Sequence, residues 1–207
     1  MVLAGAGSVQ TLGPHEFAET ALVRGAVVWF TPGVVHRLVN DGGLEILAIM
    51  SNGGLPEAGD AVLTFPADVL ADVGRYREAA TLPTPEHRPD ADADADADDE
   101  VVAAPARTRR DLALEGFGTL RARREDEGSS GLHDLYAAAE RLVADRVPEW
   151  RKIWAASVLA ETTATAHALA DLAQGNAPHL AQAAVGSATA HLGPRGYGMC
   201  GRLTSYV

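Results

Sequence analysis

Hydrophobic residues in the first third of the chain gather in short runs that turn-forming residues separate. The segments ALVRGAVVWF (21–30) and LEILAIM (44–50) are apolar and partly β-branched, and Gly, Pro, Asn or Asp bound them. The turn signals LGPHE, TPG, NDGG and SNGG follow one another closely. This spacing favours an antiparallel meander or barrel over βαβ units, which need a long crossover between strands. Residues 1–66 are therefore predicted to be β.

A further strand and a short helix complete this first region, which we place at 1–78. The segment DAVLTF (60–65) is predicted to add a strand. PADVLADVG (66–74) is predicted to form a short helix, with Pro66 in its first turn and Gly74 beyond its end.

Residues 79–106 have the composition of a linker. They combine prolines with an alternating Asp-Ala tract, which repels itself and cannot bury a core. The aspartates have no fixed chelating geometry, so a solvated, disordered linker is favoured over a divalent-cation site.

Residues 107–207 show mainly helical periodicity, and an αα-hairpin is predicted at about 130–175. Pro148 separates its two arms, and Gly175 with Asn176 supplies a C-cap. A third, shorter helix is expected near Pro178. The segment 108–126 is only partly periodic, because Gly116 and Gly118 interrupt it. The apolar positions of the two arms are Leu132, Leu135, Tyr136, Ala139, Leu142, Val143 and Val147, and then Trp150, Ile153, Trp154, Val158, Leu169 and Leu172.

Charge and cysteine usage narrow the class of protein. The 207 residues carry a formal charge of −11, but seven acidic residues lie within 90–100, so the rest carries only −4. This balance argues against nucleic acid or an anionic membrane as a partner. Cys200 is the only cysteine, so an intrachain disulfide is excluded. Without a basic leader or an apolar stretch long enough to span a bilayer, a cytoplasmic protein is expected.

Most common catalytic motifs are missing from the sequence. VLAGAGSVQ (2–10) lacks the third glycine and the following helix of a dinucleotide-binding turn. There is no HExxH, GxSxG or Walker loop. Cys200 is expected to be packed rather than nucleophilic. Four histidines in the helical region are expected to be surface or satisfied residues: His133, His167, His179 and His191.

One spacing stands out, in GAVVWFTPGVVHRLVN (25–40). Gly25 is expected to allow a close approach between strands, and Pro32 with Gly33 to reverse the chain. His36 then alternates with its neighbours along a strand, and Asn40 is expected to end that strand. This stretch resembles the second signature of the cupin family, G-x5-P-x-G-x2-H-x3-N. Thr31 stands where the family usually has its first proline.

The resemblance implies a cupin-type β-barrel in which His36 is an inward-facing metal ligand. Cupins usually draw further ligands from an earlier signature, G-x5-H-x-H-x3,4-E-x6-G, of which only the tail resembles the chain from Val2 onward. His15 is the only other histidine upstream of His36. Two accounts remain open, an N-terminally truncated chain, which we favour, and a degenerate cupin that uses His36 and at most His15. One histidine cannot hold a transition metal tightly, so this chain is expected to be metal-poor.

The expected fold is therefore α+β, a partial antiparallel cupin-type barrel followed by an acidic linker and a helical region. The expected function is binding of a small molecule. In a complete form, the resemblance implies a bound Fe, Mn, Ni or Zn ion and a metal-dependent oxygenase or isomerase. The alternative is a non-catalytic binding or oligomerisation protein with a degenerate barrel, and a homo-oligomer is plausible in either case.

Overall fold

A three-stranded antiparallel sheet and a series of helices make up the chain, which is α+β as the sequence predicts. The structure is a computed structural model and describes residues 1–13, 16–50, 55, 61–83, 95–190, 195–204 and 206. Two compact units are present. The first comprises Met1–Ile49, Leu63–Leu142 and Gly193–Leu203, and the second comprises Met50–Val62, Val143–Leu192 and Thr204–Val207.

The sheet lies in the first unit and has the order β2-β1-β3, with β1 (Val2–Leu12) in the centre. β2 (Phe17–Val23) and β3 (Val35–Ile46) both pair with it in the antiparallel sense. Leu12 is fully buried and lies opposite Phe17 on one side and Val35 on the other. Within the described residues the sheet does not close into a barrel.

The strands differ from their predicted bounds in three places. Residues 26–30 lie outside any strand, and residues 61–65, in the segment predicted to add a strand, do not form one. The predicted turn NDGG lies inside β3, where register shifts against β1 let the strand bend and continue to Ile46. Asn40 therefore does not end the strand. Its Oδ1 instead accepts hydrogen bonds from the amides of Gly42 and Leu44, both at 3.0 Å, which holds the bulged backbone.

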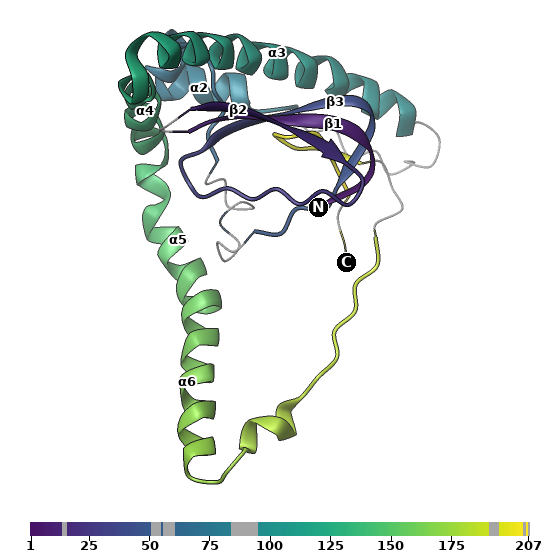
Figure 1. The fold of residues 1–207 in the computed structure, drawn as a ribbon, viewed down its shortest axis with the longest axis vertical. Coiled ribbons are helices and arrows are strands. Elements are labelled where there is room, and N and C mark those ends of the chain that lie inside the picture. Colours follow the sequence, from purple (N-terminus) through teal and green to yellow (C-terminus); the bar gives the residue numbers. More distant parts are fainter. Residues whose placement is uncertain are drawn as a thin grey trace. The chain divides into compact units, whose positions relative to one another are not determined.

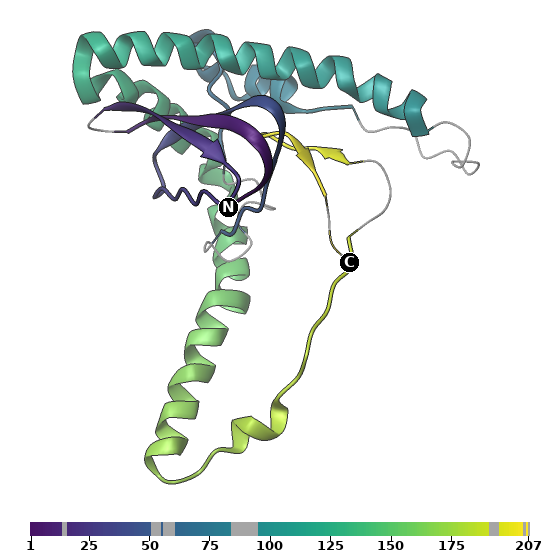
Figure 2. The ribbon, with the colours of Figure 1, turned by 45° about the vertical axis from the view of Figure 1, so that its right-hand side comes forward.

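α3 (Ala95–Glu127) covers one face of the sheet (Figures 1 and 2). Two cation–π contacts join them: Arg121 lies 4.0 Å above the ring of Phe17, and Arg37 lies 5.3 Å from that of Phe117. Arg124 also donates to the carbonyl of Gly13 at 3.2 Å. Because side chains alternate along a strand, this face carries Arg37 of β3, and the opposite face carries His36 and Leu38.

The predicted linker boundary is wrong for its described residues. α3 begins at Ala95, so 95–106 is helical, with Pro105 inside the helix. Residues 79–80 belong to α2 (Val73–Ala80), and residues 84–94 lie outside the described residues. Alanine is the strongest helix former, and acidic residues near a helix N-terminus interact favourably with its dipole. The Asp and Ala residues from 95 onward are therefore compatible with the first turns of α3.

The predicted helix at 66–74 is split in two. α1 (Ala67–Leu70) ends before Asp72, whose carboxylate accepts a hydrogen bond from the amide of Arg75 at 2.9 Å and caps α2. Gly74 consequently lies within α2 rather than beyond a helix end. Val69 and Leu70 of α1 are buried, together with Phe65 just before it.

The helices after α3 begin and end largely where the sequence predicts. η1 (Gly128–Leu132) leads into α4 (His133–Val143), and η2 (Ala144–Arg146) precedes α5 (Val147–Trp154), with Pro148 in its first turn as predicted. A π-helical turn, η3 (Ala155–Leu159), joins α5 to α6 (Ala160–Ala173). η4 (Pro178–Gln182) is the expected short helix. β4 (Gly196–Tyr197) and β5 (Arg202–Leu203) form a small hairpin.

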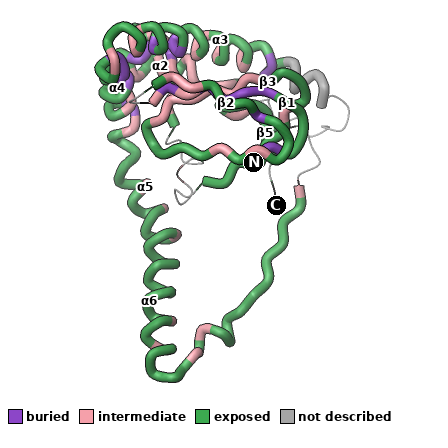
Figure 3. The backbone as a smooth tube through the Cα atoms, in the orientation of Figure 1, coloured by how far each residue is buried: buried purple, intermediate pink, exposed green. Residues whose placement is uncertain are grey.

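The C-cap predicted at Gly175 is confirmed. Gly175 has φ +77°, its amide donates to Leu172 O, and the amide of Asn176 donates to Asp171 O, both at 3.0 Å. The predicted αα-hairpin stays a prediction, because α4 and the α5–α6 run belong to different units. α5 and α6 contain no buried residue (Figure 3). Among the described residues, no helix combines the length and apolarity needed to cross a membrane.

Candidate functional site

His36 lies near the start of β3, opposite Thr11 of β1. It shares a face of the sheet with Leu38, which packs against a buried apolar cluster of Val2, Val9 and Leu22. We call this face the His36 side. Ala26 and Val28 of the segment that follows β2 also pack against this cluster. His36 lies in a strand as predicted, whereas its predicted inward orientation in a barrel stays a prediction.

The imidazole of His36 is held in place by two local contacts. Its Nδ1 lies 3.2 Å from the carbonyl oxygen of Val34, and its ring centroid lies 4.3 Å from that of Phe30, tilted by 38°. A carbonyl oxygen can only accept, so this hydrogen bond requires Nδ1 to carry the proton. In the tautomer with its proton on Nδ1, the ring carries its free lone pair on Nε2. This arrangement is how a backbone carbonyl commonly orients a metal-binding histidine.

The turn before His36 has the geometry that its sequence predicts, with one correction. Gly33 has φ +90°, and the amide of Val34 donates to Thr31 O at 3.4 Å, so Pro32 and Gly33 reverse the chain. Gly25 has φ +87°, but a Cβ at this position would meet no atom within 4 Å. Its glycine is therefore required by the backbone conformation, and the expected close approach between strands is wrong.

An element far along the chain also contacts this turn. Tyr136 of α4 donates its hydroxyl hydrogen to the carbonyl of Gly33 at 3.0 Å. The sequence analysis assigned Tyr136 only to an apolar helix stripe, and no local signal could have revealed a partner 103 residues away. Phe30, in contrast, is six residues from His36 and could have been considered from the motif itself.

The opposite face carries a polar network that does not include His36. Arg37 Nε donates to Gln10 Oε1 at 2.6 Å, and Ser8 Oγ donates to Glu19 Oε1, also at 2.6 Å. The hydrogen bonds from Ser8 and, next, Gln10 lower the pKa of the Glu19 carboxyl. Arg37 also contacts Phe117 beneath α3, so it links this network to the helix.

His36 does not belong to a cluster of candidate metal ligands in the part of the chain that is described. No group of three or more His, Cys, Asp or Glu side chains gathers at any point among these residues. The weaker candidate, His15, lies outside the described residues. His36 Nε2 can therefore act as a single nitrogen donor or hydrogen-bond acceptor next to an apolar surface, and a single donor binds a divalent ion weakly.

The other reactive residues do not form a site. His133 and His167 are exposed as expected, and His191 is outside the described residues. His179 is the exception, since its Nδ1 is buried and has no hydrogen-bond partner among the described residues. Cys200 is exposed as a residue, yet partial burial raises the pKa of its thiol. A raised pKa keeps the thiol protonated and disfavours a nucleophilic role.

Comparison with known proteins gives no family assignment: no protein-family description, curated protein or solved structure matches the chain.

Proposed function

We propose that this protein binds a small molecule on the His36 side of the sheet, as a partial, cupin-like module. The observation that carries this proposal is the placement of His36, whose Nδ1 contacts Val34 O while Nε2 has no hydrogen-bond partner among the described residues. The neighbouring Phe30 ring is 45% exposed and offers an apolar face to a ligand. The spacing from Gly25 to Asn40 supports the same reading by its resemblance to the cupin signature.

The chain itself is proposed to bind transition metals only weakly. If further ligands are supplied to the His36 side, a resident Fe, Mn, Ni or Zn ion would be held there. Such an ion could support oxygenase or isomerase chemistry, because open coordination positions can take a substrate. Without further protein ligands for a metal, His36 alone positions the small molecule and supplies a lone pair to it.

The test uses Zn²⁺ as the probe and isothermal titration calorimetry as the measurement. The full chain is expected to bind Zn²⁺ weakly and saturably, and His36→Ala is expected to abolish that binding. His133→Ala is the matched control, because His133 is exposed at the start of α4, away from the sheet. Tight stoichiometric binding, or identical binding in wild type and His36→Ala, would contradict the proposal.

A second candidate function, self-association, rests on a different observation. Large apolar side chains are exposed in the segments that follow β2 and β3: Trp29 is 84% exposed and Ile49 is 89% exposed. Val27, Phe30 and Leu47 in the same segments are also exposed. In the described sheet, β2 and β3 are both edge strands, and proteins usually cover such edges. We propose a second copy of this chain as the partner.

Sedimentation velocity tests this association. The wild-type chain is expected to form a homo-oligomer, and the double variant Trp29→Ser, Ile49→Ser is expected to shift it toward monomer by removing apolar contact area. Leu169→Ser is the control, because Leu169 is 63% exposed but lies on α6. A monomeric wild type, or an equal effect of the control, would exclude this surface as the interface.

A further inference from the structure

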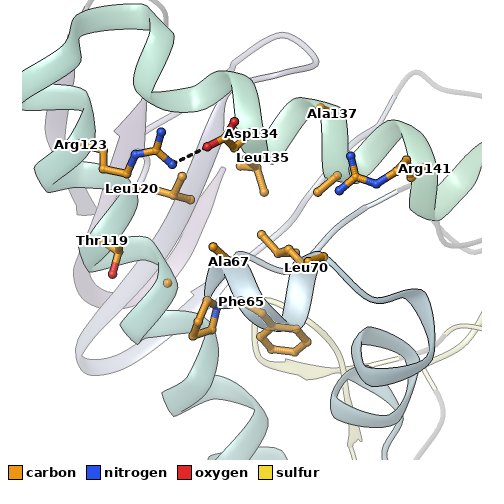
Figure 4. Close-up of a pocket in the computed structure, with 14 residues that line it drawn as sticks. Phe65, Ala67, Leu70, Thr119, Leu120, Arg123, Asp134, Leu135, Ala137 and Arg141 are labelled. Carbon is orange, nitrogen blue, oxygen red and sulfur yellow. Dashed lines mark hydrogen bonds and ion pairs between the residues drawn. The ribbon is translucent and has the colours of Figure 1, made fainter.

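A cavity of about 270 Å³ lies between α1, α3 and α4, within the first unit. Its walls are mostly apolar, and five of the lining side chains are buried: Phe65, Leu70, Leu120, Leu135 and Ala138. Figure 4 shows that the labelled side chains among them come from all three helices and from Phe65, two residues before α1. A hollow with this lining provides a site for a compact apolar group.

The charged side chains around the cavity carry a net positive charge. They are Arg123 of α3 and Asp134 and Arg141 of α4. Arg123 donates to Asp134 Oδ2 at 2.8 Å, the contact dashed in Figure 4, and it also pairs with Glu127. Its charge is therefore already neutralised. Arg141 has no hydrogen-bond or ion-pair partner within the described part of the chain, so one cation beside the cavity remains uncompensated.

Backbone packing fixes the position of these groups. Gly116 lets α3 contact the backbone of Thr64 and Phe65 directly. Gly131 lets η1 turn closely against α3, since a Cβ there would lie 2.7 Å from the carbonyl oxygen of Arg123. Gly116 thereby holds α3 against the segment that precedes α1. Gly131 holds the start of the α4 region against α3, so that these elements enclose the cavity. A cavity that is preformed by backbone contacts binds a ligand at a lower entropic cost.

We propose that this cavity binds a small carboxylate with a compact apolar tail. The tail packs against Phe65, Leu70 and Leu120, and the carboxylate accepts hydrogen bonds from the guanidinium of Arg141. Arginine is suited to this ligand because its planar donors match the two oxygens of a carboxylate. The volume is slightly below the usual range for drug-sized ligands, which favours a short tail over a long acyl chain.

The test compares three probes of equal length but different charge on the full chain. Octanoate, octanol and octylamine are titrated separately, and amide chemical shifts are followed by ¹H–¹⁵N correlation spectra. Octanoate is expected to shift amides of α1 and α4 saturably and to bind about three- to fivefold more tightly than octanol, the effect expected for an exposed charge pair. Octylamine is expected to bind most weakly. Equal affinities for octanoate and octanol, or no shifts around the cavity, would overturn the proposal.

Variants separate the charge from the apolar body of the ligand. Arg141→Met keeps much of the side-chain length and is expected to reduce octanoate binding to the level of octanol. Arg110→Met is the matched control, because Arg110 is exposed on α3 and pairs with Asp111. Ala67→Leu places extra volume at an exposed lining position and is expected to weaken octanoate and octanol alike. Equal losses in Arg141→Met and Arg110→Met, or unchanged binding in Ala67→Leu, would place the ligand elsewhere.

This proposal is independent of the site at His36. His36→Ala is expected to leave octanoate binding unchanged, because His36 lies on the sheet and the cavity is lined by residues of the helices and the segment before α1. A loss of octanoate binding in His36→Ala would contradict the cavity assignment.

Discussion

Gly116→Ala is expected to destabilise the protein by about 3 kcal/mol, the cost typical of overpacking a closely packed contact. A Cβ at this position would overlap the carbonyl oxygen of Thr64 and lie 2.6 Å from the carbonyl carbon of Phe65. Both obstacles are backbone atoms, which cannot move aside as the end of a side chain can. α3 would have to separate from the segment that carries buried Phe65. Urea denaturation, followed by circular dichroism, measures the free energy of unfolding.

Gly118→Ala is the matched control, two residues along the same helix. A Cβ there would meet nothing within 4 Å, and the residue is exposed. Alanine is the better helix former, so this variant is expected to be more stable than wild type by roughly 0.5–1 kcal/mol. The pair should therefore change stability in opposite directions. Destabilisation of both variants to the same extent would show that helix propensity, rather than the contact with Thr64, sets the effect.

Gly7→Ala is expected to cost a similar amount, about 3 kcal/mol, by forcing β1 and β3 apart. Its Cβ would overlap the carbonyl oxygen of Val39 and lie 3.0 Å from a methyl group of Leu44. The clash falls at a register shift between the two strands, where the backbone already departs from regular pairing. Increased exchange of the β3 amides, together with a lower unfolding midpoint in urea, would report the separation.

Gly42→Ala provides the control for the sheet. Gly42 lies in β3, has no positive φ, and a Cβ there would meet nothing within 4 Å. Its stability is expected to stay within about 0.5 kcal/mol of wild type, as for most exposed substitutions. If Gly7→Ala were equally neutral, the close pairing of β1 with β3 would not exist in solution, and the placement of His36 on that sheet would lose its support.

Sequence patterns were sufficient to predict those elements that depend on residues close together in the chain. The presence of strands before residue 46, Pro148 at a helix start and Gly175 at a helix end all depend on neighbours within a few residues, and the structure has these three features. Gly116 was read as a helix breaker because glycine has low helix propensity. Its actual role is a contact with Thr64, 52 positions away, which no local pattern contains.

The same reasoning explains how the two candidate sites differ. His36 was found from the sequence because its turn, its strand and its hydrogen bond to Val34 all lie within a few residues of it. The cavity was not found, because its lining combines residues near 65–71, 116–123 and 134–141. In the sequence, Arg141 is one of many charged residues on a helix. Only the fold distinguishes it, since Arg123 is neutralised by its partners and Arg141 is not.

The central claim is that Nε2 of His36 presents a free lone pair on the His36 side of the sheet. A long-range ¹H–¹⁵N correlation spectrum of the His36 ring, recorded at mildly alkaline pH and during addition of Zn²⁺, tests it most directly. We expect the ring proton on Nδ1, which contacts Val34 O, and a shift of the Nε2 resonance as Zn²⁺ is added. A ring protonated on Nε2, or a His36 signal that Zn²⁺ leaves unchanged while other nitrogens respond, would contradict the account.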